Sequence, residues 1–259
     1  MLTEVHVPED VPAAVGLIVS GATVLGGGTS LMPALNDYGS PPTELVSLRR
    51  TGLSGITVTG STVTIGATTT LSQIEHDSRL QILNPVVRSI ASVPVRNLAT
   101  VGGNLFVPQP YGDLAVALVA LNARAVPAGG SGPAELPLER PALVTAVTFE
   151  LPAPGVFKYV KAARRRWNSA SLVTVAATIV ELDGLVSGAR VALGGVSDHI
   201  VRAAAVEEAL LGRPLTEETV AAAARAGLGE LSPADDAYAS AWYRTRVFPV
   251  HLRRALLGR

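Results

Sequence analysis

The sequence predicts an α+β fold made of two domains, and three observations lead to this prediction. The chain has 259 residues, enough for one large or two modest hydrophobic cores. Short alternating runs typical of strands are interspersed with helical patterns along the whole chain. The segment Pro152-Ala153-Pro154-Gly155 combines rigid and turn-forming residues, which makes it the best boundary. We therefore expect one domain over residues 1–152, with subdomains over about 1–52 and 53–152, and a second over 156–259.

The first subdomain has the pattern of a small β-α-β-α-β unit. Leu2–Val7 alternates apolar and polar residues as a strand does, and Asp10 is placed to cap the helix that follows. A glycine-rich loop separates the second strand from the second helix. The expected elements are strands over Leu2–Val7, Ala22–Leu25 and Glu44–Ser47, and helices over Val11–Ser20 and Leu31–Leu35.

The second subdomain begins with a hairpin and continues with helices. Two alternating runs flank Gly60-Ser61, a pair that suits a two-residue turn. The expected strands are Ile56–Thr59, Thr62–Gly66, Ala123–Val126 and Leu143–Leu151, and the expected helices are Leu71–His76, Pro85–Val93 and Asp113–Leu121.

The C-terminal domain reads as three strands followed by helices. Leu182-Asp183-Gly184 joins two of the strands as a hairpin. Thr216 with Glu217 and Glu218 favours a helix start through both capping and the helix dipole. The expected strands are Val156–Ala162, Ser171–Leu182 and Val186–Gly194, and the expected helices are Ala203–Leu211, Thr216–Leu228 and a last helix near Ala237–Leu257.

The amino-acid composition excludes several classes of protein and of site. Apolar residues make up 48% of the chain and charged residues 16%, with a formal net charge of zero, which argues against disorder and against a nucleic-acid partner. The chain has no cysteine, so it supplies no disulfide, no iron–sulfur ligand and no thiolate nucleophile. The histidines, His6, His76, His199 and His251, are scattered and form no metal-binding set. If the protein handles electrons, its metal centres must lie on other chains.

No membrane segment or export signal is visible in the sequence. The run Ala115–Ala123 is shorter than the roughly 20 residues that a bilayer requires, so it reads as a buried helix. We expect a cytoplasmic protein.

Two glycine loops are the candidate functional elements. Gly26-Gly27-Gly28 follows a strand, and Thr29 or Ser30 can cap the next helix, which is the general form of a phosphate cradle. The stretch Ala99–Asp113 places Gly102-Gly103 and two prolines before another helix, and these glycines permit positive φ and a close approach of another group to the backbone. Neither loop carries the lysine of a nucleotide-triphosphate loop. The pair therefore predicts a long diphosphate ligand between them.

Each candidate residue also has a plainer interpretation. The glycines can serve tight backbone packing, Asp113 can cap a helix, and Asn104 can stabilise a turn. Lys161 can be a solvated lysine of a basic strand. The cluster Arg164-Arg165-Arg166 can face a partner or protect a sheet edge.

Four motifs in order resemble a known family. They are GGGTSLMPAL (Gly26–Leu35), IGATTTLSQI (Ile65–Ile74), VPVRNLATVGGN (Val93–Asn104) and the dipeptide Gly112-Asp113. The sequence is similar to the FAD-binding subunits of molybdenum hydroxylases, of the carbon monoxide dehydrogenase and xanthine dehydrogenase type. The chain departs from the usual family pattern at Ala99 and at Pro108-Gln109-Pro110.

The resemblance implies a two-part FAD-binding domain followed by a three-stranded antiparallel sheet with a helical layer. It implies non-covalent FAD, with no catalytic residue and no metal ligand on this chain. The binding residues that it implies are Leu25, Gly26, Gly27, Gly28, Thr29, Ser30, Leu31, Ile90, Thr100, Gly103, Asn104, Asp113 and Lys161. In this reading the first loop binds the diphosphate, the second closes over it, and Asp113 accepts hydrogen bonds from ligand hydroxyls.

The resemblance also implies partner chains. They are a small [2Fe–2S] subunit, which delivers electrons to the FAD, and a large molybdenum-cofactor subunit, which oxidises the substrate. The FAD then passes the electrons to NAD⁺, a quinone or oxygen, so the chain is an oxidoreductase subunit of a hetero-oligomer. Two alternatives remain: a scaffold that has lost FAD, and a stand-alone flavin oxidase.

Overall fold

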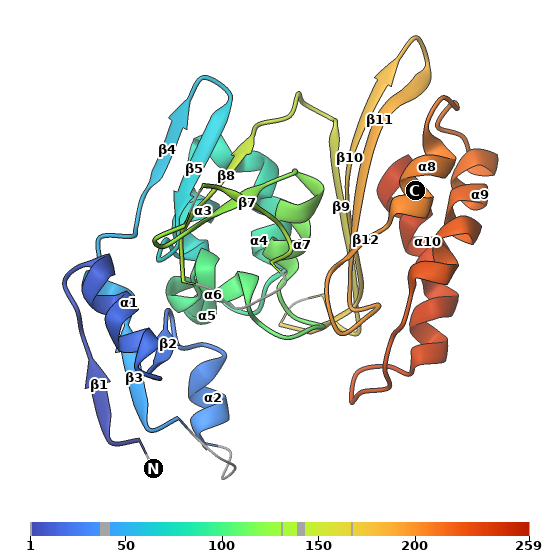
Figure 1. The fold of residues 1–259 in the computed structure, drawn as a ribbon. Helices are drawn as coiled ribbons and strands as arrows, with labels where there is room; N and C mark the ends of the chain where they lie inside the picture. Colours follow the sequence, from blue (N-terminus) through green and yellow to red (C-terminus); the bar gives the residue numbers. More distant parts are fainter. Residues whose placement is uncertain (1, 37–41, 131, 139–142, 167, 259) are drawn as a thin grey trace.

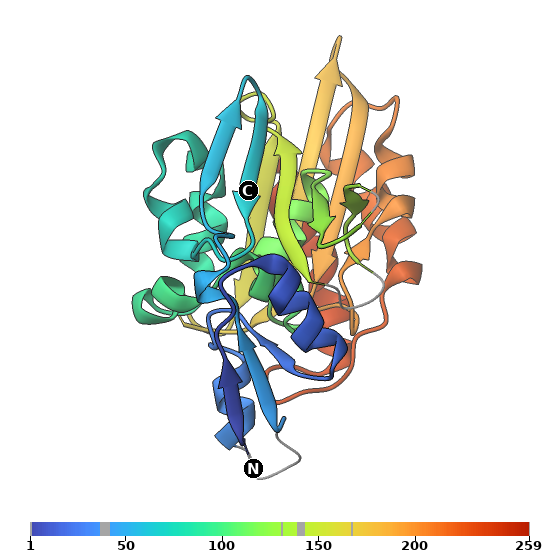
Figure 2. The same ribbon diagram turned by 60° about the vertical axis from the view of Figure 1, so that its left-hand side comes forward.

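The computed structural model describes residues 2–36, 42–130, 132–138, 143–166 and 168–258. Three sheets organise these residues, and each has its own helices (Figure 1). A small parallel sheet lies at the lower edge of the molecule, and two antiparallel sheets stand above it (Figure 2). The α+β fold class predicted from the sequence is confirmed.

The N-terminal unit is the expected β-α-β-α-β arrangement. Its parallel strands have the order β1-β3-β2, and Ala14, Ala22, Val46 and Leu48 form its core. Asp10 caps the first helix, since its Oδ1 accepts a hydrogen bond from the Ala13 N–H at 2.8 Å. The elements are β1 (Glu4–His6), α1 (Val11–Val19), β2 (Thr23–Leu25), α2 (Leu31–Asn36) and β3 (Glu44–Ser47).

The central unit is an antiparallel sheet of order β4-β5-β8-β6-β7 with helices on one side. Its strands are β4 (Ile56–Thr59), β5 (Thr62–Gly66), β6 (Arg124–Pro127), β7 (Ala134–Glu135) and β8 (Val144–Glu150). Its α-helices are α3 (Leu71–His76), α4 (Asn84–Ser89), α5 (Val93–Leu98), α6 (Val101–Leu105) and α7 (Asp113–Ala120), with 3₁₀ turns at Leu48–Arg50 and Ser78–Leu83. The hairpin predicted across Gly60-Ser61 is confirmed.

The helix predicted over Pro85–Val93 is wrong. Helix α4 ends at Ser89, Ala91 takes a left-handed conformation with φ of 45°, and α5 starts at Val93. Pro94 lies in the first turn of α5, the part of a helix where the missing proline N–H costs nothing. Pro94 therefore marks the start of a second helix and not the end of a longer first one.

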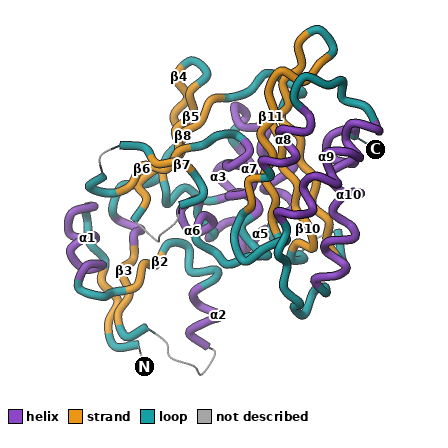
Figure 3. The backbone as a smooth tube through the Cα atoms, turned by 45° about the vertical axis from the view of Figure 1, so that its right-hand side comes forward, coloured by secondary structure: helices purple, strands orange, loops and turns teal. Residues whose placement is uncertain are grey.

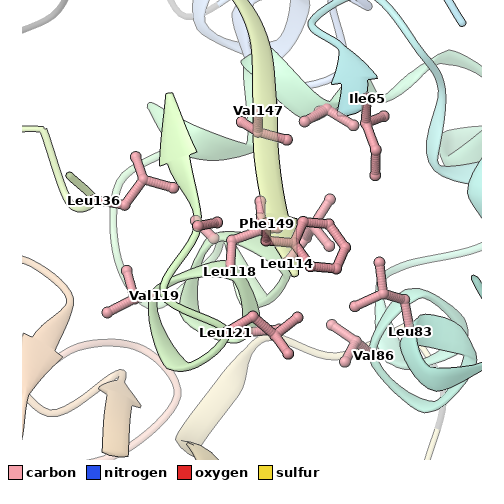
Figure 4. Packing of buried hydrophobic residues seen from close by; sticks show 14 of the residues in the cluster. Ile65, Leu83, Val86, Leu114, Leu118, Val119, Leu121, Leu136, Val147 and Phe149 are labelled. Carbon is pink, nitrogen blue, oxygen red and sulfur yellow. The ribbon is translucent and has the colours of Figure 1, made fainter. Parts of the chain in front are cut away.

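Helix α7 lies between the two antiparallel sheets, and every one of its residues is buried. Leu114 and Leu118 pack beside Phe149 of β8 (Figure 4). The same hydrophobic cluster continues into the C-terminal sheet through Ala176 and Ala192. Helix α7 thus packs against both antiparallel sheets.

The C-terminal unit is a four-stranded antiparallel sheet of order β12-β11-β10-β9. Three strands were expected, and the fourth has only two residues. Asp183 and Gly184 form the predicted tight turn, with φ of 53° and 76°. The strands are β9 (Phe157–Ala163), β10 (Ser171–Leu182), β11 (Leu185–Gly194) and β12 (Val201–Arg202).

A layer of helices covers the face of this sheet that is opposite to α7 (Figures 1 and 3). The last helix begins at Ala241 and not at Ala237, because Ser240 caps it and Asp236 holds the preceding turn through the N–H groups of Tyr238 and Ala239. The helices are α8 (Ala204–Leu210), α9 (Glu217–Gly227) and α10 (Ala241–Leu257), with a 3₁₀ turn at Leu228–Glu230. Within the described ranges, no helix has both the length and the apolar character to cross a membrane.

Candidate functional site

The first glycine loop connects β2 to α2 and presents unused hydrogen-bond donors. Gly28 has φ of 74°, a left-handed conformation that favours glycine. Among the described contacts, the backbone N–H groups of Gly27, Gly28, Thr29 and Ser30 have no hydrogen-bond acceptor. Four consecutive free donors before a helix are a donor set suited to an anion with several oxygens.

The second glycine stretch is a short helix, α6, so Gly102 and Gly103 do not use the positive φ that glycine permits. Thr100 caps α6, since its Oγ1 accepts from the Gly103 N–H at 3.1 Å. The N–H groups of Val101 and Gly102 donate to the carbonyls of Thr69 and Ala67. The backbone donors of this stretch are therefore already used, and the free donors belong to the first loop.

The two loops pack directly on each other. A Cβ on Gly26 would lie 2.9 Å from Oγ1 of Thr100, and a Cβ on Gly27 would lie 1.7 Å from the carbonyl oxygen of Leu98. Gly27 is therefore required by backbone packing, and a Cβ on Gly26 would crowd the capping hydroxyl of Thr100, which supports the plainer of the two interpretations. Packing does not explain the four free N–H groups. The first loop thus has a structural requirement for glycine and, in addition, an open donor set.

Asn104 ties the second stretch to α7. Its side chain is buried, and Oδ1 accepts a hydrogen bond from the Ala115 N–H at 3.0 Å. This bond satisfies one of the backbone donors that a helix leaves free in its first turn. Asn104 therefore positions the start of α7, where Asp113 lies.

Asp113 is the centre of a buried polar cluster. Oδ1 accepts hydrogen bonds from Ser171 Oγ and Thr174 Oγ1, both at 2.6 Å, and Oδ2 lies 2.8 Å from Lys161 Nζ. The Asp113 and Lys161 side chains are only 6% and 7% exposed. The helix cap is Gly112 and not Asp113, which occupies the first helical position. This carboxylate joins α7 to β9 and β10.

Sequence reasoning did not identify Ser171 and Thr174. Residues three apart on a regular strand point to opposite faces of the sheet. The β9–β10 register shifts between Ser171 and Val173, so a bulge turns both hydroxyls toward the same side. A bulge leaves no reliable signal in a single sequence.

Lys161 also reaches the end of α4. Nζ donates to the Ser89 carbonyl at 3.0 Å, and Ser89 Oγ lies 2.9 Å from the hydroxyl of Tyr159. Burial and the nearby charge of Asp113 raise the pKa of Tyr159 well above its usual value. Ile90 follows Ser89, is partly buried against the central core, and accepts from Arg96 Nη1 through its carbonyl. Lys161 is thus a buried, partnered lysine and not a solvated one.

A cavity of about 230 Å³ opens beside Lys161. Its described lining consists of Ser89, Lys161, Ala163, Arg164, Arg165 and Arg166. The three arginines are exposed and follow directly on the end of β9.

The structure divides the predicted residues into two groups. The first surrounds the paired loops: Leu25, Gly26, Gly27, Gly28, Thr29, Ser30, Leu31, Thr100 and Gly103. The second surrounds the buried ion pair: Asp113, Lys161 and, beside Ser89, Ile90. Asn104 lies between them, because it belongs to the second loop and bonds to α7.

Two family descriptions match the chain. The "FAD binding domain in molybdopterin dehydrogenase" matches residues 2–148, and the "CO dehydrogenase flavoprotein C-terminal domain" matches residues 158–258.

Individual relatives cover nearly the whole chain. The carbon monoxide dehydrogenase medium chain of Hydrogenophaga pseudoflava is 31% identical over 98% of this chain and 95% of its own length. The xanthine dehydrogenase FAD-binding subunit of Escherichia coli O157:H7 is 28% identical over 89% of this chain and 84% of its own. A solved structure of the Hydrogenophaga pseudoflava carbon monoxide dehydrogenase, in a form that lacks the Mo-pyranopterin moiety, superposes with a TM-score of 0.90 over 99% of this chain and 96% of that chain, at 29% identity.

Proposed function

The chain belongs to the family of FAD-binding domains of molybdopterin dehydrogenases, and we propose that its Gly27–Ser30 backbone holds the diphosphate of FAD. The single observation that supports this assignment is the set of four consecutive N–H groups without an acceptor among the described residues. A diphosphate carries several anionic oxygens that accept such bonds, and a helix N-terminus adds favourable electrostatics.

Other residues complete the proposed site. The Thr29 and Ser30 hydroxyls lie on the same loop as the free donors, flanked by Leu25, Gly26 and Leu31. On the second stretch, the family resemblance adds Thr100, Gly103 and Asn104, of which Gly103 is exposed. Ile90 supplies apolar surface beside Ser89. FAD supplies the redox chemistry when bound, while this chain binds it, orients it and sets its electrostatic surroundings.

We assign Asp113 two roles, one structural and one in ligand binding. Its Oδ1 already accepts two hydrogen bonds, so the first role is to fix β10 and Lys161 in place. Oδ2 accepts from Lys161 alone among the described donors, and a carboxylate oxygen has room for a second bond. A hydroxyl of the ligand would fill that position.

The chain is the FAD-binding subunit of a multi-subunit molybdenum hydroxylase. We propose that a small [2Fe–2S] chain supplies its electrons and that a large molybdenum-cofactor chain carries the substrate site. The absence of cysteine agrees with this division, because iron–sulfur clusters need thiolate ligands from another chain. The relatives are themselves subunits by name, a medium chain and an FAD-binding subunit. A cytoplasmic location and the division into domains over residues 1–152 and 156–259 remain predictions.

The test uses one exposed side chain of the first loop. Ser30 is exposed, so Ser30→Asp adds a negative charge beside the free donors without disturbing packing. Ser30→Asn is the matched control, because asparagine has nearly the same shape as aspartate and carries no charge. FAD titration of the deflavinated full chain, followed by flavin fluorescence, should give at least tenfold weaker binding for S30D and near wild-type binding for S30N.

Two results would overturn the proposal. One is equal FAD affinity of S30D and wild type, which would remove the diphosphate from this loop. The other is a wild-type chain that takes up no FAD either alone or with its partner subunits. Thermal unfolding of each variant verifies that a loss of binding is not a loss of folding.

A further inference from the structure

We propose that Arg244 of α10 is a positioning residue for the Asp113 carboxylate, on which it acts through Ser171. This inference rests on the proposed function, since it concerns how the carboxylate is held for a ligand hydroxyl. Among the described contacts, Arg244 has none with Asp113 itself. Its helix belongs to the layer on the face of the C-terminal sheet that is opposite to α7, so its effect passes through the end of the sheet (Figure 1).

Arg244 is a buried cation with one carboxylate partner. Its side chain is 2% exposed, and Nη2 lies 2.7 Å from Oδ2 of Asp236. Asp236 is itself fixed, because its Oδ1 accepts the N–H groups of Tyr238 and Ala239. The ion pair therefore sets the direction of the guanidinium fork and leaves Nη1 to bind elsewhere.

Nη1 binds the backbone of the β10 bulge. Leu172 is the extra residue of this bulge, because the β9 register passes over it between Ser171 and Val173. Pairing with β11 begins only at Thr174, so the register gives Leu172 no partner on that side either. Nη1 of Arg244 donates to the Leu172 carbonyl at 2.6 Å and, over a longer distance of 3.2 Å, to the Ser171 carbonyl. A buried backbone carbonyl outside the regular ladder needs a donor, and Arg244 supplies it.

The bulge directs the Ser171 hydroxyl to Asp113. Ser171 Oγ donates to Asp113 Oδ1 at 2.6 Å, and both residues are buried. Since Arg244 fixes the carbonyls of Ser171 and its neighbour, it fixes the backbone from which this hydroxyl extends. A hydroxyl held in this way keeps the carboxylate in one orientation, with Oδ2 at Lys161. Arg244 therefore acts on the cofactor site from the opposite face of the sheet.

Gly195 provides a second connection from Arg244 to Asp113. Its carbonyl accepts from Arg244 Nη1 at 2.7 Å, and its N–H donates to Gln109 Oε1 at 2.8 Å. Gln109 Nε2 in turn donates to the carbonyl of Tyr111, in the loop that leads to Asp113. A Cβ on Gly195 would lie 3.0 Å from Arg244 Nη1, so glycine leaves the room that the guanidinium occupies. One side chain thus holds both the loop before α7 and the hydroxyl that bonds Asp113.

A guanidinium is required for this arrangement. It presents five N–H donors in a planar fork, so it serves a carboxylate on one side and carbonyls on the other at the same time. A lysine at this position keeps the charge, but its single nitrogen does not occupy both places. Arg244→Lys therefore removes the geometry of the contact and retains its charge.

The experiment compares S171A, R244K and the double variant R244K/S171A in the deflavinated full chain. FAD affinity, followed by flavin fluorescence, should fall about tenfold in S171A, which is the lower end of what a hydrogen bond to a charged group contributes. R244K should show a similar loss. The double variant should bind no more weakly than R244K, because both changes remove the same orientation of the Asp113 carboxylate.

Inorganic pyrophosphate separates positioning from a general loosening of the fold. This probe has a diphosphate and no carbon-bound hydroxyl, so it competes with FAD at the Gly27–Ser30 donors and has no group for Asp113 to orient. Its inhibition constant should be the same in wild type, S171A and R244K, whereas S30D should raise it. A loosened fold would raise the constant in R244K as well.

Two further variants complete the set. Arg190 is a largely buried arginine that bonds the Val119 carbonyl and Glu135 at the other end of α7, so R190K should bind FAD like wild type. Asp236 is partly exposed, and asparagine there keeps an acceptor for the turn while it loses the ion pair with Arg244. D236N should therefore weaken FAD binding when Ser171 is present and not in S171A. This variant takes the place of R244K if lysine prevents folding.

The inference fails on any of three results. They are an S171A variant that binds FAD like wild type, a double variant whose loss is the product of the two single losses, and a pyrophosphate inhibition constant that rises in R244K together with the FAD dissociation constant. Wild-type protein that binds FAD without competition from pyrophosphate would contradict only the diphosphate assignment, since the double variant and R190K still decide the role of Arg244. Thermal unfolding verifies that each variant measured is folded.

Discussion

Asp113 of α7 and Lys161 of β9 form an ion pair of 2.8 Å that is almost completely buried, and it joins the two predicted domains. The pair is embedded in further hydrogen bonds from Ser171, Thr174 and the Ser89 carbonyl. A buried pair of this kind is sensitive to the loss of one partner, because the other charge remains without compensation. Substitutions here will therefore affect folding as well as ligand binding.

Asp113→Ala should destabilise the fold by about 3–5 kcal/mol, the usual cost of leaving one charge of a buried pair alone. Urea unfolding of the full chain measures this change. The double variant D113A/K161M should recover part of the loss, because it removes the stranded ammonium as well. Equal stabilities of the single and double variants would contradict the interpretation of the pair.

Thr174→Val should lower the free energy of unfolding by about 1.5–3 kcal/mol, the range for a hydrogen bond to a charged group. Thr178→Val provides a control on the same strand, since the Thr178 hydroxyl bonds to the neutral Ala120 carbonyl at 2.8 Å. That control should cost only about 0.5–1.5 kcal/mol. The prediction fails if T178V costs as much as T174V in the same denaturant series.

Gly27→Ala should lower stability by about 1–3 kcal/mol or more, as overpacking does, because its Cβ would lie 1.7 Å from the Leu98 carbonyl oxygen. The same variant should weaken FAD binding by shifting the loop. Gly16→Ala is the control. Gly16 is exposed within α1, and a Cβ built there would meet nothing within 4 Å. Alanine should therefore raise the free energy of unfolding by about 0.5–1 kcal/mol. Thermal and urea unfolding of both variants would be compared, and a harmless G27A would contradict the backbone contact.

Tyr111→Phe should lower the folding stability below pH 10, because it removes a contribution that the wild-type protein loses only in alkali. The hydrogen bond with Tyr238 raises the pKa of Tyr111 from 10.0 to about 12. A pKa raised on folding gives stability that is complete below pH 10 and is lost between pH 10 and 12. The melting temperatures of wild type and Y111F should therefore differ below pH 10 and converge above it. Tyr238→Phe should behave in the same way, and a difference independent of pH would exclude this origin.

Local sequence signals predicted the elements whose determinants lie within a few residues. The Asp183-Gly184 turn and the Asp10 cap depend on side chains and backbone preferences at those positions, so a single sequence contains them. The same holds for the first glycine loop between β2 and α2. Family resemblance then connected this loop to Asp113 and Lys161, which local reasoning could not.

Features that depend on tertiary contacts could not be read from the sequence. The bulge that aligns Ser171 with Thr174 arises from pairing with β9. The departure at Pro108-Gln109-Pro110 also has its explanation in the C-terminal unit, since Gln109 Oε1 accepts the Gly195 N–H at 2.8 Å and Tyr111 contacts Tyr238. The break between α4 and α5 was missed because an apolar helical pattern continued through Ala91, whose left-handed backbone has no local marker.

Helix α7 has a consequence for how the protein is made by the ribosome. Its last carbonyls, those of Val119 and Ala120, are bonded by Arg190 and Thr178, and Val116 packs so closely on Gly194 that a Cβ there would lie 2.7 Å away. The partners of this helix are thus synthesised some 60 to 80 residues after it, counting from Val116 to Thr178 and Gly194. Until they emerge, the nascent chain carries an apolar helix with one face uncovered, and such a surface invites aggregation. The hydrophobic core of the N-terminal half is therefore complete only after β11 has been translated.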